Sequence, residues 1–86
     1  MVKPAVLLQR LLAGNLANVR FEDLLRLVEA LGFELARVSG SHHVYRRADV
    51  SELLNLQPHR GRAKPYQIRQ LLVLVRVYNL SLRDKA

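Results

Sequence analysis

Two adjacent histidines follow a short Ser-Gly-Ser turn near the middle of the chain, and arginines stand on both sides of them. Backbone N–H groups in a short turn can bind an anion. Histidine can accept and donate a proton near neutral pH, and arginine binds phosphate through two parallel hydrogen bonds. The segment from Arg37 to Arg47 therefore combines the groups needed to bind or cleave a phosphodiester. The alternative is an arginine-rich hairpin whose histidines only occupy strand positions.

Cleavage of RNA makes specific demands on such a segment. A base must take the proton from the ribose 2′-OH, an acid must protonate the leaving 5′-oxygen, and donors must stabilise the phosphoryl oxygens. His42 is the candidate base, and Arg37, Arg46 and the backbone N–H groups near Gly40 are candidate phosphate donors. The general acid stays open, because His59 is either that acid or a solvated loop residue.

Other chemistries fit the sequence less well. A His-His pair suggests zinc, but neighbouring strand residues point to opposite faces and further ligands are missing. We therefore expect His43 to have a structural role. Ser41 has neither a base nor an orienting acid to make it a nucleophile, so it is grouped with Gly40 as an RNA-contacting turn residue. The seven acidic residues are scattered, so we expect no magnesium cluster, no other metal and no cofactor.

A second basic segment lies further along the chain. Arg60, Arg62 and Lys64 occupy a loop that also contains Gly and Pro, and Arg69 lies just inside the helix that follows. Such a cluster is typical of a phosphate-contacting patch on a nucleic-acid-binding protein. The alternative is a solvated loop. Tyr66, beside these cations, either stacks on a base or simply starts the helix.

Composition limits the classes of function. The chain has 86 residues, which indicates one small domain, and its formal charge of +7 favours an acidic partner such as nucleic acid, an anionic membrane or an acidic protein. It has no cysteine, which excludes disulfides and fits a reducing compartment. No apolar segment approaches the length of about 20 residues that spans a bilayer. We expect a cytoplasmic protein without a signal peptide or membrane span.

The hydrophobic spacing predicts three helices. Pro4 begins a short helix that ends at Gly14. A second helix begins at Phe21, repeats apolar residues every three or four positions, and ends at Gly32. Pro65 begins the third helix.

The third helix is apolar almost all round. Val73, Leu74 and Val77 fall outside its main apolar stripe, and such a helix is either deeply buried or meets a partner. We expect these three residues to pack on the first helix, with a contact to a partner protein as the alternative.

Three strands are predicted between the second and third helices. They cover residues 33–38, 42–47 and 53–57, with turns at 39–41 and 48–51 and the basic loop at 58–64. The chain is therefore α+β, in the order α-α-β-β-β-α, with a three-stranded antiparallel sheet, helices on one face and the other face open. If Tyr45 packs towards the helices, His42 and Arg46 lie on the open face.

Residues 21–80 contain Gly32-Phe33-Glu34-Leu35, the run from Gly40 to Tyr45, the basic loop and the final amphipathic helix. Together these features resemble the HicA family of bacterial toxin ribonucleases. The resemblance implies a fold like a double-stranded-RNA-binding domain and cleavage of mRNA without a metal. It also implies that His42 is catalytic and that a cognate HicB-type antitoxin covers the active site.

The sequence departs from the family pattern in two places. Pro65-Tyr66 stands where members commonly have Gly-Thr, and Met1–Asn18 has no counterpart in the shortest members. We divide the chain into a helical extension (1–18), a HicA-like ribonuclease domain (19–80) and a polar, frayed tail (81–86). The extension packs either on the domain or on the antitoxin.

Three classes of function are compatible with the sequence. The first is a toxin that cleaves mRNA as a metal-independent endoribonuclease, and the second is a non-catalytic RNA-binding module that uses the same basic surface. They differ in whether RNA processing needs His42. The third is a protein-interaction domain whose basic face serves only an acidic partner, which predicts no salt-dependent affinity for RNA. A membrane-surface role is weaker, because the first helix has little basic polar face.

Overall fold

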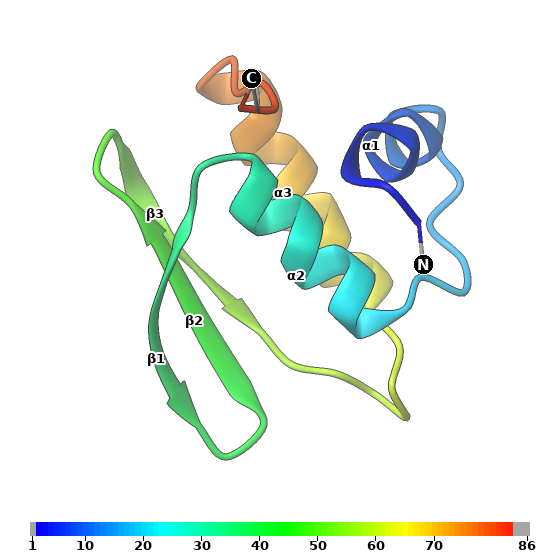
Figure 1. The fold of residues 1–86 in the computed structure, drawn as a ribbon, viewed down its shortest axis with the longest axis horizontal. Coiled ribbons are helices and arrows are strands. Elements are labelled where there is room, and N and C mark those ends of the chain that lie inside the picture. The colour runs from blue at the N-terminus through cyan, green and yellow to red at the C-terminus, as the bar shows by residue number, and fades with distance from the viewer. Residues whose placement is uncertain (1, 84–86) are drawn as a thin grey trace.

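The computed structural model describes residues 2–83, and its helices and strands follow the predicted order. The elements are α1 (Pro4–Leu12), α2 (Phe21–Ala30), β1 (Glu34–Ser39), β2 (His42–Arg47), β3 (Val50–Leu56) and α3 (Pro65–Val77). Figure 1 shows the sheet on one side of the α2–α3 pair and α1 on the other side. The predicted α+β fold is therefore confirmed.

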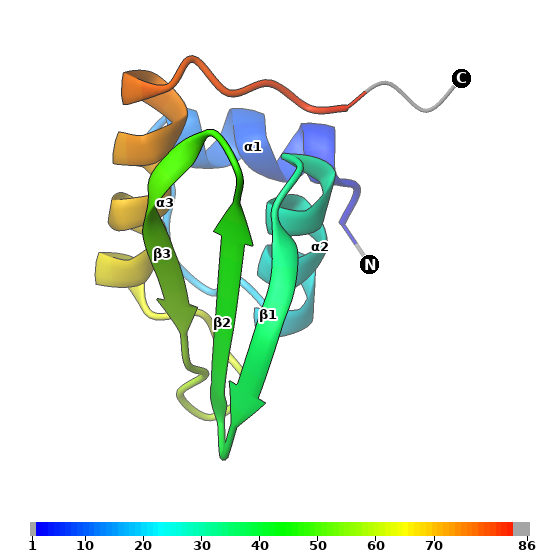
Figure 2. The same cartoon turned by 90° about the vertical axis from the view of Figure 1, so that its left-hand side faces the viewer.

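The sheet has the strand order β1-β2-β3, and both pairs are antiparallel. Ser39 pairs with His42, so only Gly40 and Ser41 connect β1 to β2. Gly40 has φ +58°, the positive value that a type II′ hairpin turn needs at its first position. One face of the sheet packs on α2 and α3, and the other faces the viewer in Figure 2 without a helix on it.

Strand β3 is longer than predicted. It begins at Val50 rather than at residue 53, and the preceding turn takes only Ala48 and Asp49. Val50 pairs with Arg47 and is buried. The strand therefore begins at Val50, because its pairing with Arg47 places the valine side chain in the core.

The core is built from apolar side chains of all three helices and of the inner face of the sheet. Leu7 and Leu11 of α1 are each only 1% exposed and belong to this core. Helix α1 therefore packs on the domain, against α2 and α3, which settles where the extension lies. None of the helices within residues 2–83 is long and apolar enough to span a membrane.

The prediction for the outer side of α3 is partly wrong. Leu74 is buried, but Val73 and Val77 are 53% and 68% exposed. These two valines are therefore not packed on α1. Val73 instead borders a shallow hollow that it shares with Leu53 of β3.

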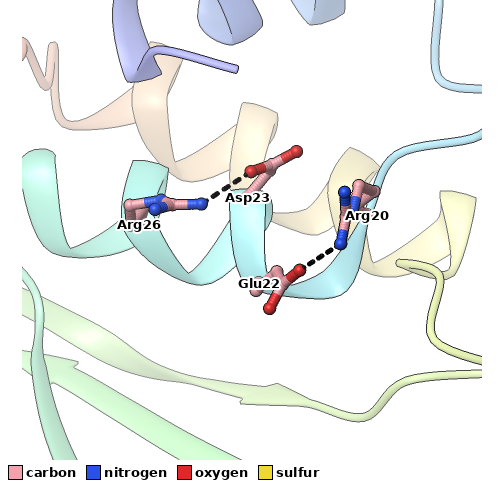
Figure 3. A network of polar contacts seen from close by, with 4 residues as sticks. All are labelled: Arg20, Glu22, Asp23 and Arg26. Atoms are coloured by element: carbon pink, nitrogen blue, oxygen red, sulfur yellow. Dashed lines mark hydrogen bonds and ion pairs between the residues drawn. The ribbon is translucent and has the colours of Figure 1, made fainter. Parts of the chain in front are cut away.

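Helix α2 begins with two carboxylates, each paired with an arginine (Figure 3). Glu22 lies 2.6 Å from Arg20, and the buried Asp23 lies 2.8 Å from Arg26. Negative charge in the first turn is favourable near the positive end of the helix dipole. These acidic groups therefore serve the start of α2 and not the phosphodiester chemistry.

The expectation of a frayed tail is wrong for its described part. Leu82 is partly buried against the core, and the backbone N–H of Arg83 donates to the carbonyl oxygen of Ala30 over 2.8 Å. The guanidinium of Arg83 packs on Gly32, where a Cβ atom would lie 2.7 Å from its Nε. This segment thus covers the C-terminal end of α2. Residues 84–86 lie outside the described part of the chain.

A polar clamp joins the start of β3 to the end of α3. The hydroxyl of Tyr78 donates to Glu52 over 2.6 Å, and the hydroxyl of Ser51 lies 2.9 Å from the same carboxylate oxygen. The hydrogen bond from Tyr78, followed by that from Ser51, lowers the pKa of Glu52. The carboxylate form is therefore favoured in the folded protein.

We expect Tyr78→Phe to raise the pKa of Glu52 towards its ordinary value, since it removes the main cause of the lowering. A depressed folded-state pKa stabilises the protein above the unfolded-state pKa, and this stabilisation is lost as the pH falls through the folded-state value. The variant should therefore lose less stability on acidification. NMR titration of the Glu52 carboxyl group measures the shift, with Ser51→Ala as the weaker control. An unchanged titration in Tyr78→Phe would contradict the clamp.

Candidate functional site

Strand β2 divides its side chains between the two faces of the sheet. Tyr45 is 1% exposed on the helix side, where its hydroxyl donates to Glu29 over 3.2 Å. Burial, together with the charge of Glu29 and this hydrogen bond, raises the pKa of Tyr45 to about 12. Alternation then directs His42 and Arg46 to the open face, and both are exposed there.

The imidazole of His42 has one side-chain partner, which lies on the neighbouring strand. Nδ1 of His42 is 3.0 Å from Oδ1 of Asn55. The pairing of Val44 with Asn55 in the β2–β3 ladder brings this amide beside the histidine. Because an amide oxygen can only accept, the contact places the proton on Nδ1 and leaves Nε2 as the acceptor of the neutral ring. An exposed nitrogen acceptor on the open face is what a general base requires.

The turn before His42 is tied to the loop after β3. Nε2 of Gln57 donates to Oγ of Ser41 over 3.1 Å, and Nζ of Lys64 donates to Oε1 of Gln57 over 3.4 Å. The backbone N–H of Gln57 donates to Oε1 of Gln67 over 3.0 Å, and Gln67 is only 4% exposed. A buried polar side chain on α3 thus holds the strand end that orients the turn.

His43 faces the other way. Its ring packs edge-on against Phe21, with centroids 5.2 Å apart. Its Nδ1 lies 3.1 Å from the carbonyl oxygen of Ser41, to which it donates, because a carbonyl can only accept. These contacts fit the structural role expected for His43.

The candidate phosphate donors on the sheet are not all close to His42. Arg37 lies opposite Val44 on β1, on the open face and near His42. Arg46 pairs with Glu34 at the other end of the sheet, four residues and so about 13 Å from His42 along the strand. Arg46 also lines a separate hollow together with Arg83. The structure therefore groups Arg37, but not Arg46, with the histidine.

The basic loop lies at the same end of the molecule as the Gly40-Ser41 turn (Figures 1 and 2). Arg60 and Arg62 are exposed in that loop, and Arg69 is exposed one turn into α3. Within residues 2–83, no carboxylate lies within ion-pairing distance of these three arginines or of Arg37. Their charge is available to an anion.

Sequence reasoning missed three residues of this arrangement. Asn55 orients His42, Gln57 holds the turn, and Gln67 anchors Gln57. The alternation of Leu54 and Leu56, both buried, could have placed Asn55 on the open face. The roles of Gln57 and Gln67 depend on how α3 docks, and no local signal carries that information.

No group of three or more His, Cys, Asp or Glu side chains within residues 2–83 is arranged to hold a metal ion. A family model described as "HicA toxin of bacterial toxin-antitoxin" matches residues 21–75, from the start of α2 into α3. Searches of curated proteins and of solved structures gave no match.

Proposed function

We propose that this chain, which belongs to the HicA family of bacterial toxins, cleaves mRNA as a metal-independent endoribonuclease at the His42 end of its open sheet face. Family membership makes the chain the toxin of a toxin–antitoxin system, with a cognate antitoxin as its partner. The reaction and the residues that carry it are the proposal.

One observation carries the proposal most directly. His42 is exposed on the open face, with Nδ1 held by Asn55 at 3.0 Å and Nε2 directed away from that contact. A histidine that only filled a strand position would not need an oriented ring. Arg37 and the backbone of the Gly40-Ser41 turn lie beside it and can hold the phosphate.

The groups present supply the base and the phosphate donors of the first step. Nε2 of His42 takes the proton of the ribose 2′-OH, and the 2′-oxygen attacks the adjacent phosphorus. Arg37 and the turn N–H groups stabilise the charge that develops on the phosphoryl oxygens. The bond to the 5′-oxygen breaks, and that oxygen takes a proton from solvent water. The products are a 2′,3′-cyclic phosphate and a 5′-hydroxyl, and no step needs a metal ion.

We further propose that the antitoxin is a HicB-type protein that covers the His42 face. Arg37 is exposed on this face, and Arg60 and Arg62 are exposed in the basic loop at the same end of the molecule, all three without carboxylate partners in the described chain. The toxin carries a net charge of +7. An acidic antitoxin surface would complement these charges and accelerate association at low salt.

The test is cleavage of a defined RNA by the purified chain in EDTA, with and without the cognate antitoxin. We expect cleavage to persist in EDTA, to leave cyclic phosphate ends, and to stop when the antitoxin is added. We also expect the rate of inhibition to fall with salt. If the chain binds RNA with a steep salt dependence but does not cleave it, the non-catalytic RNA-binding module replaces the toxin ribonuclease.

A further inference from the structure

A second candidate site lies at the same end of the molecule as the Gly40-Ser41 turn, where three separate segments meet. The connector between α1 and α2, the basic loop and the start of α3 line an open hollow of about 530 Å³. This volume is within the range of small-molecule sites, roughly 300–1,000 Å³. Leu16 and Asn18 of the connector, His59 of the basic loop and Tyr66 of α3 are among its lining residues.

The lining combines apolar surface with positive charge. Leu16, Ala63, Pro65 and the ring of Tyr66 provide the apolar part. Three cationic side chains belong to the same lining, and no carboxylate of the described chain does. An apolar hollow with several cations suits a ligand that has a flat apolar ring and adjoining anionic groups.

The wall of the hollow is a closed turn rather than an irregular loop. His59 and Arg62 exchange both backbone hydrogen bonds, at 2.9 and 3.0 Å. The two residues between them, Arg60 and Gly61, have φ values of +52° and +76°. Two successive positive φ values are the pattern of a type I′ turn. The cations are therefore presented by an ordered element.

Backbone hydrogen bonds also join this turn to the connector before α2. The N–H of Ala63 donates to the carbonyl oxygen of Val19 over 2.8 Å. The N–H of Phe21 donates to the carbonyl oxygen of Gly61 over 3.0 Å. Two sides of the hollow are thus fixed relative to each other before a ligand arrives. Preorganisation of this kind reduces the ordering cost of binding.

Tyr66 supplies an aromatic surface at the third side. Its side chain is 51% exposed in the first turn of α3, and its hydroxyl accepts from Nε2 of the buried Gln67 over 3.4 Å. A single exposed aromatic residue is ordinary on a protein surface. Here the ring borders a preformed hollow with Arg60, Arg62 and Lys64 around it, an arrangement suited to base stacking with phosphates nearby.

We propose that this hollow is a nucleobase subsite: it binds one unpaired base of the RNA, stacked on Tyr66, with the adjoining phosphates on Arg60, Arg62 and Lys64. The inference rests on the proposed function, because it takes the ligand to be the RNA that is cleaved. Single-stranded RNA is commonly recognised through unstacked bases on aromatic side chains. An acidic protein segment, which offers charge but no flat ring, would leave Tyr66 without a role.

The nucleobase subsite is connected to the cleavage site by two hydrogen bonds. Lys64 contacts Gln57, and Gln57 contacts Ser41 in the turn that precedes His42. A base held in the subsite therefore sets which phosphodiester reaches His42. Cleavage should occur at a constant distance along the strand from the preferred base.

Part of the subsite lies outside the region that the family model matches. Leu16 and Asn18 precede residue 21, where the match begins. The amide of Asn18 is exposed at the rim and offers both a donor and an acceptor to a base edge. The base preference would therefore depend partly on a segment in which this chain departs from the shortest family members.

The test measures RNA binding in the full chain carrying His42→Ala, so that the RNA stays intact. The probe is a short single-stranded RNA with one fluorescent 2-aminopurine, and a matched RNA lacks the base at that position. We expect the fluorescence to fall on binding and Tyr66→Ala to weaken binding of the base-containing RNA about tenfold. Tyr66→Phe, which keeps the ring, should bind normally, and Tyr66→Ala should not change affinity for the abasic RNA.

The proposal is overturned if Tyr66→Ala weakens both RNAs equally or neither. It is also overturned if a polyglutamate peptide displaces the RNA from this hollow and is insensitive to Tyr66→Ala, which would assign the hollow to a protein partner. Cleavage by the wild-type chain in EDTA is scored separately. Loss of cleavage with base-dependent binding intact would reject the ribonuclease and keep the subsite.

Discussion

Replacing His42 by alanine is expected to lower the rate of RNA cleavage by about 10²- to 10⁴-fold, the usual contribution of a positioned general acid or base. The side chain is exposed and makes one polar contact, with Asn55. Its removal should therefore leave the fold intact. Affinity for RNA should change little, because the cations that hold the backbone remain. Single-turnover cleavage and an equilibrium binding measurement, made on the same preparation, separate the two effects.

The matched control is His59→Ala. His59 is an exposed histidine of the basic loop, on the wall of the nucleobase subsite, so the control removes an imidazole near the RNA without touching the open face. A large loss of rate only in His42→Ala supports the assignment and excludes His59 as the general acid, whereas a large loss in both variants would make His59 the acid. Equal activity of wild type and His42→Ala would mean that another group is the base, or that a contaminant cleaves the RNA.

Asn55→Ala gives an intermediate variant in the same assay. Asn55 acts through His42, since it holds the ring and the tautomer. We expect a smaller loss of rate than in His42→Ala, with a changed pH profile of the rate and unchanged RNA affinity. Asn55→Asp keeps an acceptor for Nδ1 and should restore part of the rate. A purely structural residue would not change the pH profile.

The arrangement of β2 could be predicted from sequence because strand geometry is local. Alternate residues point to opposite faces, so one buried aromatic, Tyr45, assigns the neighbouring positions. The exposed side of His42 and the inward side of His43 follow from this single assignment. Hydrophobic spacing likewise placed the helices, since a helix that packs on a sheet needs an apolar stripe.

What the sequence did not show depends on contacts between distant segments. The pairing of β2 with β3 brings Asn55 to His42, and the docking of α3 brings Gln67 to Gln57. The exposure of Val73 and Val77 has the same origin, because it depends on how the helices and the sheet pack together. The hydrophobic spacing within one helix or strand does not determine how segments distant in sequence pack against each other.

The structure brings together two segments that are expected from the sequence to differ from the family pattern. Pro65-Tyr66 and the segment before residue 21 lie far apart in sequence, yet Leu16, Asn18 and Tyr66 line one hollow. The hydrogen bond from Ala63 to Val19 holds these segments together. Differences at both places would then act on one property, the recognition of RNA beside the cleavage site.

We expect a large effect on the free energy of unfolding from a substitution in α1, which lies outside residues 21–75 that the family model matches. We expect Leu11→Ala to lower the free energy of unfolding by about 2–5 kcal/mol, as for other fully buried leucines. Leu11 is 1% exposed and belongs to the same core as α2 and α3. This cost is a large fraction of the stability of a small domain, roughly 5–15 kcal/mol in general.

The matched control is Leu12→Ala, the same substitution at the next position of α1, where the side chain is 45% exposed. Its effect should stay within about 0.5 kcal/mol, as for ordinary surface changes. Urea unfolding followed by circular dichroism measures both variants. Equal, small effects would mean that α1 is not docked in solution. The connector that carries Leu16 and Asn18 would then be unanchored on its N-terminal side, and the nucleobase subsite would lose a fixed wall.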